Sequence, residues 1–164
     1  MSTIDSEYIG KRAPDFSLPD QDDVVRTLSE YQGQKLLLYF YPKDLTPGCT
    51  LEAEVFRDLH STLAKFSVAV VGVSADSTRR HRQFRDKLEL PFQLLSDTEG
   101  SALRDYGVWV EKTMFGKKYM GIARESFLID EQGNVLKHYR KVSPAKHGEE
   151  VLKDLESLKS NSPK

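Results

Sequence analysis

The chain has very little cysteine: Cys49 is the one thiol among 164 residues. A single thiol cannot close an internal disulfide, and it cannot supply the several thiolates of a structural zinc site or an iron–sulfur cluster. The sequence therefore excludes a disulfide-rich secreted scaffold. It also excludes a thioredoxin-type disulfide reductase, which depends on a Cys-x-x-Cys pair.

Long apolar runs and a charge excess are also lacking. The longest apolar runs, residues 36–41 and 68–73, are far too short for a membrane-spanning helix. Residues 1–16 carry charges where a secretory signal would be apolar, so we expect a cytoplasmic protein with no membrane partner. The 24 Lys and Arg residues are balanced by 25 Asp and Glu residues, so no basic excess indicates a nucleic-acid partner.

The length and composition fit one globular domain. With 38% hydrophobic and 30% charged residues, the chain is neither disordered nor fibrous in composition. No linker, repeat or low-complexity segment divides it. We therefore expect a single domain over residues 1–164, with an ordered core over about residues 5–159.

Strand and helix patterns alternate along the chain. Residues 35–41 are nearly all apolar, which predicts a strand that is covered on both faces. The patterns predict a hairpin over 15–27, strands over 35–41, 68–74 and 93–95, helices over 47–66, 79–88 and 101–106, a second hairpin over 126–139, and a last helix around 151–158 that frays by Asn161. This order predicts an α/β sandwich: a mixed central β-sheet flanked by helices, with an N-terminal β-hairpin.

The candidate reactive residue, Cys49, follows the first central strand. Thr46 suits a helix N-cap and Pro47 the first helical position, so Cys49 is expected in the first helical turn. Backbone N–H groups and the helix dipole favour negative charge there, and we expect them to lower the thiol pKa from its usual value of about 8.5. The neighbouring charges and turn residues argue against deep burial, although an inert buried thiol is the commoner state of a lone cysteine.

The spacing Pro42-x-x-x-Thr46-x-x-Cys49 is similar to the active-site motif of the peroxiredoxins. The match extends beyond this spacing, since four segments follow the family pattern in order, the second and third of which contain the motif residues: Ala13-Pro14-Asp15-Phe16, Phe40-Tyr41-Pro42-Lys43-Asp44, Thr46-Pro47-Gly48-Cys49-Thr50-x-Glu52, and Gly121-Ile122-Ala123-Arg124-x-Ser126-Phe127-Leu128-Ile129-Asp130. Over nearly its whole length the chain resembles the bacterioferritin-comigratory, or peroxiredoxin Q, branch. The resemblance implies a thioredoxin-like fold and thiol-dependent reduction of hydroperoxides, with no metal and no organic cofactor.

The resemblance also implies roles for individual residues. Cys49 would be the peroxidatic cysteine, whose sulfur attacks the peroxide. Thr46 and Arg124 would hold the peroxide, while Pro42 and Gly48 would line the substrate site and shield the thiolate from water. The Thr46 hydroxyl, the Arg124 guanidinium and the Cys49 backbone N–H are hydrogen-bond donors that suit a reaction in which negative charge moves from sulfur onto two oxygens.

Two of these assignments have plain alternatives. Arg124 is equally consistent with an ordinary surface or structural ion pair. Glu52 would orient an arginine according to the resemblance, but a carboxylate beside a helix N-terminus needs no further role.

The chain departs from the family pattern at Glu54. Many members of the branch have a resolving cysteine there, five residues after the peroxidatic one. Without it, the sulfenic acid of Cys49 must be reduced by an external thiol such as thioredoxin, glutaredoxin with glutathione, or another small thiol. We therefore expect a one-cysteine cycle, with an intermolecular Cys49 disulfide dimer as one oxidised form. The resemblance also implies a monomer.

Two other functions remain open at this point. The same thiol suits a peroxide-sensing module that relays oxidation to a partner protein instead of turning over. A cysteine acyl-transfer enzyme would need a histidine base, and none lies in the motif.

The remaining histidines and aromatic residues point to no further site. The histidines lack metal-ligand spacing and are expected on the surface: His60, His81, His138 and His147. One aromatic-rich segment is consistent with core packing, a pocket rim or a dimer contact: Trp109, Phe115, Tyr119 and Met120.

Overall fold

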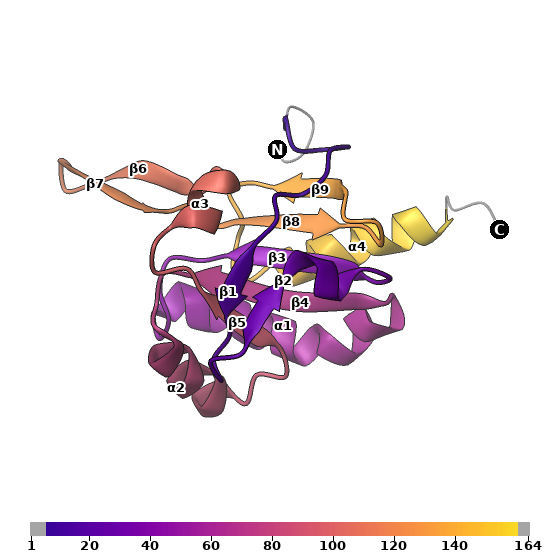
Figure 1. Cartoon of the computed structure of the whole chain (residues 1–164), viewed down its shortest axis with the longest axis horizontal. Coiled ribbons are helices and arrows are strands. Elements are labelled where there is room, and N and C mark those ends of the chain that lie inside the picture. Colours follow the sequence, from indigo (N-terminus) through magenta and orange to yellow (C-terminus); the bar gives the residue numbers. More distant parts are fainter. Residues whose placement is uncertain (1–5, 161–164) are drawn as a thin grey trace.

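The computed structural model describes residues 6–160 of the chain. A five-stranded mixed sheet in the order β5-β4-β3-β8-β9 forms its centre (Figure 1). The strands are β1 (Ser17–Pro19), β2 (Val25–Thr27), β3 (Lys35–Phe40), β4 (Val68–Ser74), β5 (Gln93–Ser96), β6 (Trp109–Met114), β7 (Lys117–Ile122), β8 (Glu125–Ile129) and β9 (Val135–Tyr139). The helices are α1 (Pro47–Lys65), α2 (Thr78–Leu88), α3 (Ser101–Asp105) and α4 (His147–Ser160), with a 3-10 turn over Leu28–Tyr31.

Strand β3 is the central strand, as its apolar run predicts. It pairs in parallel with β4 and antiparallel with β8, which makes the sheet mixed. Leu36, Leu37, Leu38, Tyr39 and Phe40 are each at most 1% exposed, because both faces of the sheet are covered. The predicted α/β sandwich with a mixed central sheet and an N-terminal hairpin is confirmed.

Alternate side chains of β3 lie in two different hydrophobic core layers, one on each face of the sheet. Leu37 and Tyr39 pack in the cluster that α1, α2 and α4 cover, and Cys49 belongs to this cluster. Leu36 and Leu38 pack on the opposite face, together with residues of the N-terminal segment and α3. This alternation follows from the twofold side-chain period of a strand.

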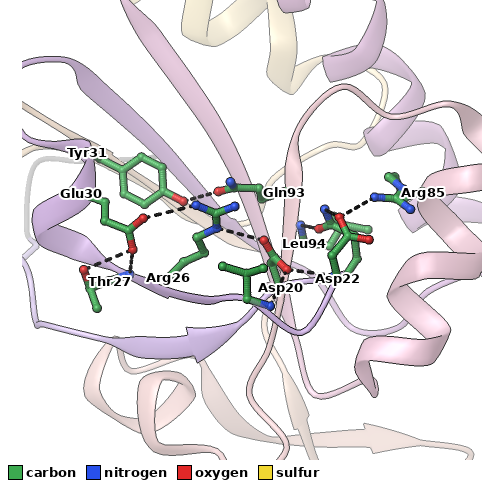
Figure 2. Close-up of polar contacts among 11 residues, drawn as sticks. Asp20, Asp22, Arg26, Thr27, Glu30, Tyr31, Arg85, Gln93 and Leu94 are labelled. Atoms are coloured by element: carbon green, nitrogen blue, oxygen red, sulfur yellow. Dashed lines mark hydrogen bonds and ion pairs between the residues drawn. The ribbon is translucent and has the colours of Figure 1, made fainter.

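The N-terminal hairpin closes one edge of the sheet (Figure 2). The Gln21 side chain accepts a hydrogen bond of 3.0 Å from the backbone N–H of Leu94, on the outer strand β5. Arg26 donates to Asp20 at 2.9 Å, and Arg85 of α2 donates to Asp22 at 2.9 Å. These contacts pair an edge N–H group that would otherwise be open to another chain, and they tie α2 to the hairpin.

Strands β6 and β7 form a hairpin that the sequence patterns did not predict. The prediction that the aromatic-rich segment packs in the core is wrong. It projects from the body of the molecule in Figure 1. Trp109, Phe115, Tyr119 and Met120 are 38%, 97%, 44% and 49% exposed. Its turn consists of Phe115 and Gly116, both with positive φ, a conformation that asparagine and glycine usually signal.

Two other predictions concern the ends of elements and membrane insertion. The expected fraying at Asn161 lies outside the described residues. Within residues 6–160, none of the helices has the length and apolar character needed to cross a bilayer.

Candidate active site

Helix α1 begins at the end of the central strand, after a short loop. Thr46 has the extended backbone of an N-cap, with φ −94° and ψ 155°, and Pro47 occupies the first turn, both as predicted. The side chain of Thr46 does not cap the helix, however. Its hydroxyl instead donates to the backbone carbonyl of Lys43 at 2.7 Å, which fixes the loop before the helix and leaves the lone pairs of Oγ1 available as acceptors.

Cys49 lies in this first turn and is 1% exposed, so the expectation that nearby charges prevent deep burial is wrong. The reason is that α1 packs against the sheet from its first turn onward. Arg124, which immediately precedes β8, places its Nη2 atom 3.4 Å from Cys49 Sγ. A guanidinium at this distance stabilises negative charge on the sulfur.

Glu52 lies one turn after Cys49 and is 1% exposed. Its Oε1 atom accepts a hydrogen bond of 2.7 Å from Arg124 Nη1, so the guanidinium bridges the carboxyl and the sulfur. Among the described residues, Glu52 Oε2 has no hydrogen-bond partner. Burial raises the pKa of Glu52 to about 7, because the loss of solvation outweighs the opposing effect of Arg124.

The raised pKa of Glu52 makes stability depend on pH. Between its ordinary pKa of 4.5 and the folded value of about 7, the folded protein binds more protons than the unfolded chain, so stability falls as pH rises. The neutral variant Glu52→Gln is expected to lack this loss. Relative to wild type, its free energy of unfolding should rise by about 3 kcal/mol across that window.

Denaturant titrations at several pH values measure this difference. Glu54→Gln, on the same helix but only half-buried, is the control and should follow wild type. A Glu52→Gln protein with the same pH dependence as wild type would contradict the argument.

The other motif residues surround the same corner. Pro42, Thr46 and Gly48 are half-buried in the loop and the first turn. A Cβ atom on Gly48 would lie 3.1 Å from Arg124 Nη2, so a larger residue there would press on the guanidinium. Glu54, at the position of the missing resolving cysteine, is half-buried on α1. The structure thus brings Cys49, Thr46, Gly48, Glu52 and Arg124 to one place.

Sequence reasoning missed a second cation near the thiol. Lys112 of β6 is half-buried, and its side chain packs against Gly121 of β7. A Cβ atom added to Gly121 would lie 3.3 Å from Lys112 Cδ. Burial lowers the pKa of Lys112, the charge of Arg124 lowers it further, and Cys49 opposes both. Lys112 therefore lies within electrostatic reach of Arg124 and Cys49.

Three of the four histidines are buried, so the expectation of surface histidines is wrong for them. His81, His138 and His147 are 0%, 3% and 1% exposed. Burial of His81 has a sequence signal: His81, Phe84 and Leu88 are spaced along one face of α2, and all three are buried. The basic residues around His81 make this apolar face hard to recognise in the sequence.

One group of residues has the geometry to approach a metal ion. Ligand atoms of Asp44, Asp76 and His81 lie within 4.8 Å of one another. These groups already have protein partners, since His81 bonds to Asp44, and Arg80 pairs with Asp76 at 3.3 Å. The arginine supplies the positive charge that a metal would bring, so we read the group as a hydrogen-bonded network.

Comparison with known proteins finds relatives that match most of the chain and that belong to one family. A model of the AhpC/TSA family matches residues 9–138. Peroxiredoxin Bcp of Bacillus subtilis (strain 168) is 45% identical over 150 residues, which are 92% of this chain and 96% of the relative.

Solved structures agree with these relatives. Peroxiredoxin Q of Xanthomonas campestris has a TM-score of 0.82 and 38% identity, over 87% of this chain and 90% of its own. Peroxidoxin BcpB of Mycobacterium tuberculosis has a TM-score of 0.82 and 34% identity, over 93% of this chain and 99% of its own. Other Xanthomonas structures carry cysteine-to-serine substitutions at two different positions, whereas this chain has one cysteine.

Proposed function

Since the chain belongs to the AhpC/TSA family and is a peroxiredoxin of the Bcp type, a thiol peroxidase, we propose that it reduces hydroperoxides by a one-cysteine cycle at Cys49. The observation that carries the proposal is the bridge of Arg124 between Cys49 Sγ and Glu52 at the start of α1. This arrangement sets a positive charge beside the one thiol of the chain.

The first half of the cycle is nucleophilic displacement at oxygen. The Cys49 thiolate attacks the terminal oxygen of the hydroperoxide, an S–O bond forms, and the O–O bond breaks. The leaving alkoxide or hydroxide takes a proton and departs as alcohol or water, and Cys49 becomes a sulfenic acid. Arg124 and the N–H groups of the first turn of α1 stabilise the negative charge as it spreads over both oxygens.

Thr46 and the loop before it hold the substrate in this proposal. Because the Thr46 hydroxyl donates to Lys43, its oxygen is left to accept a hydrogen bond from the peroxide O–H group. Pro42 and Gly48 flank the same place and exclude water. The bacterioferritin comigratory protein of Xanthomonas campestris has alkyl peroxide reduction activity, and we extend that substrate class, with hydrogen peroxide, to this chain.

The second half of the cycle uses an external thiol, because the chain holds no second cysteine. The thiol attacks the sulfenic sulfur, water leaves, and a mixed disulfide forms. A further thiol then releases reduced Cys49 and carries away the disulfide. Thioredoxin, glutaredoxin with glutathione, or another small thiol would serve. Such thiols are kept reduced in the cytoplasm, where we place the protein, acting as a single-domain monomer.

Turnover tests this proposal. Peroxide consumption is followed with each thiol donor, for wild type and for Cys49→Ser. We expect many turnovers per wild-type molecule with at least one donor, and none for Cys49→Ser. Consumption of one peroxide per protein with every donor would contradict the cycle and favour a peroxide sensor.

A further inference from the structure

Lys112 is a half-buried cation that the peroxidase chemistry above does not use. Its strand β6 pairs with β7, and the stem of its side chain lies over Gly121. A Cβ atom on Gly121 would be 3.3 Å from Lys112 Cδ and 3.5 Å from Cε, with Cε2 of the Tyr119 ring also 3.3 Å away. Gly121 therefore leaves the space in which the lysine stem lies, because any other residue would place a side chain there.

None of the carboxylates among residues 6–160 forms an ion pair with Lys112. Glu111, its neighbour in sequence, pairs instead with Lys118 at 3.6 Å. Strand alternation places Glu111 and Lys112 on opposite faces of the β6–β7 ribbon. Two charged groups act on Lys112 within this part of the chain: Arg124 repels the ammonium group, and Cys49 attracts it. The thiolate of Cys49 is thus the group that balances the charge of Lys112.

Oxidation of Cys49 removes this balancing charge. A thiolate is negative, whereas the protonated sulfenic acid that replaces it is neutral. Arg124 and Lys112 then face the carboxyl of Glu52, which is only partly ionised at neutral pH because burial raises its pKa to about 7. The oxidised site therefore holds an excess of positive charge at the stage when the second substrate must approach the sulfur.

We propose that Lys112 selects the reducing thiol, by attracting small thiols that carry a carboxylate to the sulfenic form of Cys49. The proposal rests on the external-thiol step proposed above. In that step the incoming thiolate attacks the Cys49 sulfur, an S–S bond forms, and the S–O bond breaks. The leaving hydroxide takes a proton from solvent and departs as water, so Cys49 is reduced and the incoming sulfur is oxidised. Lys112 holds the carboxylate of the thiol during the attack, and is a specificity-determining residue.

A series of small thiols of different charge tests this selection. Cys49 is first oxidised with one equivalent of hydrogen peroxide, and loss of the sulfenic acid is then followed at neutral pH. The thiols are 3-mercaptopropionate, 2-mercaptoethanol and cysteamine, which carry a negative charge, no charge and a positive charge. In Lys112→Gln, the rate constant should fall about three- to tenfold for 3-mercaptopropionate, change little for 2-mercaptoethanol and rise for cysteamine. Each thiol is compared with itself in two proteins, so its own acidity cancels.

Two matched variants separate the charge of Lys112 from a general disturbance of the hairpin. Lys112→Arg keeps the positive charge and should retain most of the wild-type rate constant with 3-mercaptopropionate. Lys118→Gln removes a cation of the same hairpin whose side chain is 75% exposed, and should leave all three rate constants close to wild type. A disturbed hairpin would instead change the three rate constants together, whatever the charge of the thiol.

A second readout does not depend on the proposed cycle. Iodoacetate and iodoacetamide alkylate a reduced thiol and have nearly the same shape, but iodoacetate carries a negative charge and iodoacetamide is neutral. The ratio of their rate constants at Cys49 should fall about three- to tenfold from wild type to Lys112→Gln. It should stay at the wild-type value in Lys118→Gln.

The results separate the selection by Lys112 from the external-thiol cycle. A loss confined to the anionic thiol in Lys112→Gln, and absent from Lys112→Arg, supports the proposal. Unchanged rate constants, equal changes for all three thiols, the same loss in Lys112→Arg or Lys118→Gln, or an unchanged alkylation ratio overturn it. If the wild-type sulfenic acid resists every thiol, the cycle fails instead, and the alkylation ratio still decides whether Lys112 attracts an anion to Cys49.

Discussion

Replacing Arg124 by glutamine is expected to lower the rate constant for oxidation of Cys49 by hydrogen peroxide about 10²- to 10³-fold. The guanidinium contacts Cys49 Sγ at 3.4 Å, so it stabilises both the attacking sulfur and the charge that moves onto the peroxide oxygens. Glutamine retains hydrogen-bonding capacity but removes the charge. Stopped-flow measurement of the oxidation step, with Cys49 reduced beforehand, gives this rate constant directly.

Two further proteins decide the interpretation of the Arg124 result. Arg79→Gln removes an exposed arginine from α2 and should match wild type. Arg124→Gln combined with Glu52→Gln tests whether the loss arises only from an uncompensated Glu52. The double variant should stay slow, because the missing charge acts on sulfur and peroxide. Recovery to near the wild-type rate would show that Arg124 serves mainly to neutralise Glu52.

Thr46→Val is expected to lower the same rate constant about 10- to 100-fold. Valine has nearly the shape of threonine but cannot donate to the Lys43 carbonyl and cannot accept from a peroxide. The loop would lose its 2.7 Å internal hydrogen bond and the substrate would lose a partner. The rate is measured at saturating and at low peroxide, because both positioning and binding should suffer.

Thr46→Ser is the matched control for Thr46→Val. Serine keeps the hydroxyl and loses only a methyl group, so it should retain most of the wild-type rate. A valine variant that keeps the wild-type rate while the serine variant loses it would mean that the methyl contact matters and the hydroxyl does not. That outcome would contradict the role assigned to Thr46 Oγ1.

The sequence was sufficient for the elements whose patterns are strong. The apolar run of β3 and the helical spacing of α1 both reflect burial against large surfaces, and the structure contains both elements close to the predicted bounds. The β6–β7 hairpin has neither kind of pattern, because most of its large apolar side chains are exposed. Its turn also places Phe115 where asparagine is common, so the turn gave no signal.

The site was only partly predictable, for a different reason. The helix start around Cys49 is local, and Thr46 and Pro47 are enough to predict it. The approach of Arg124 to the sulfur joins residues 75 positions apart, and local pattern alone does not contain it; the family resemblance supplied it. The burial of Cys49 and the contact of Asp44 with His81 depend on how α1 and α2 pack on the sheet, which composition cannot reveal.

The most direct test of the central claim is the intact mass of the folded, reduced protein after one equivalent of hydrogen peroxide. The account predicts a gain of one oxygen atom, located at Cys49, captured by a sulfenic-acid reagent and lost again when a thiol donor is added. An unchanged mass in the folded protein, with Cys49 still free, would contradict it.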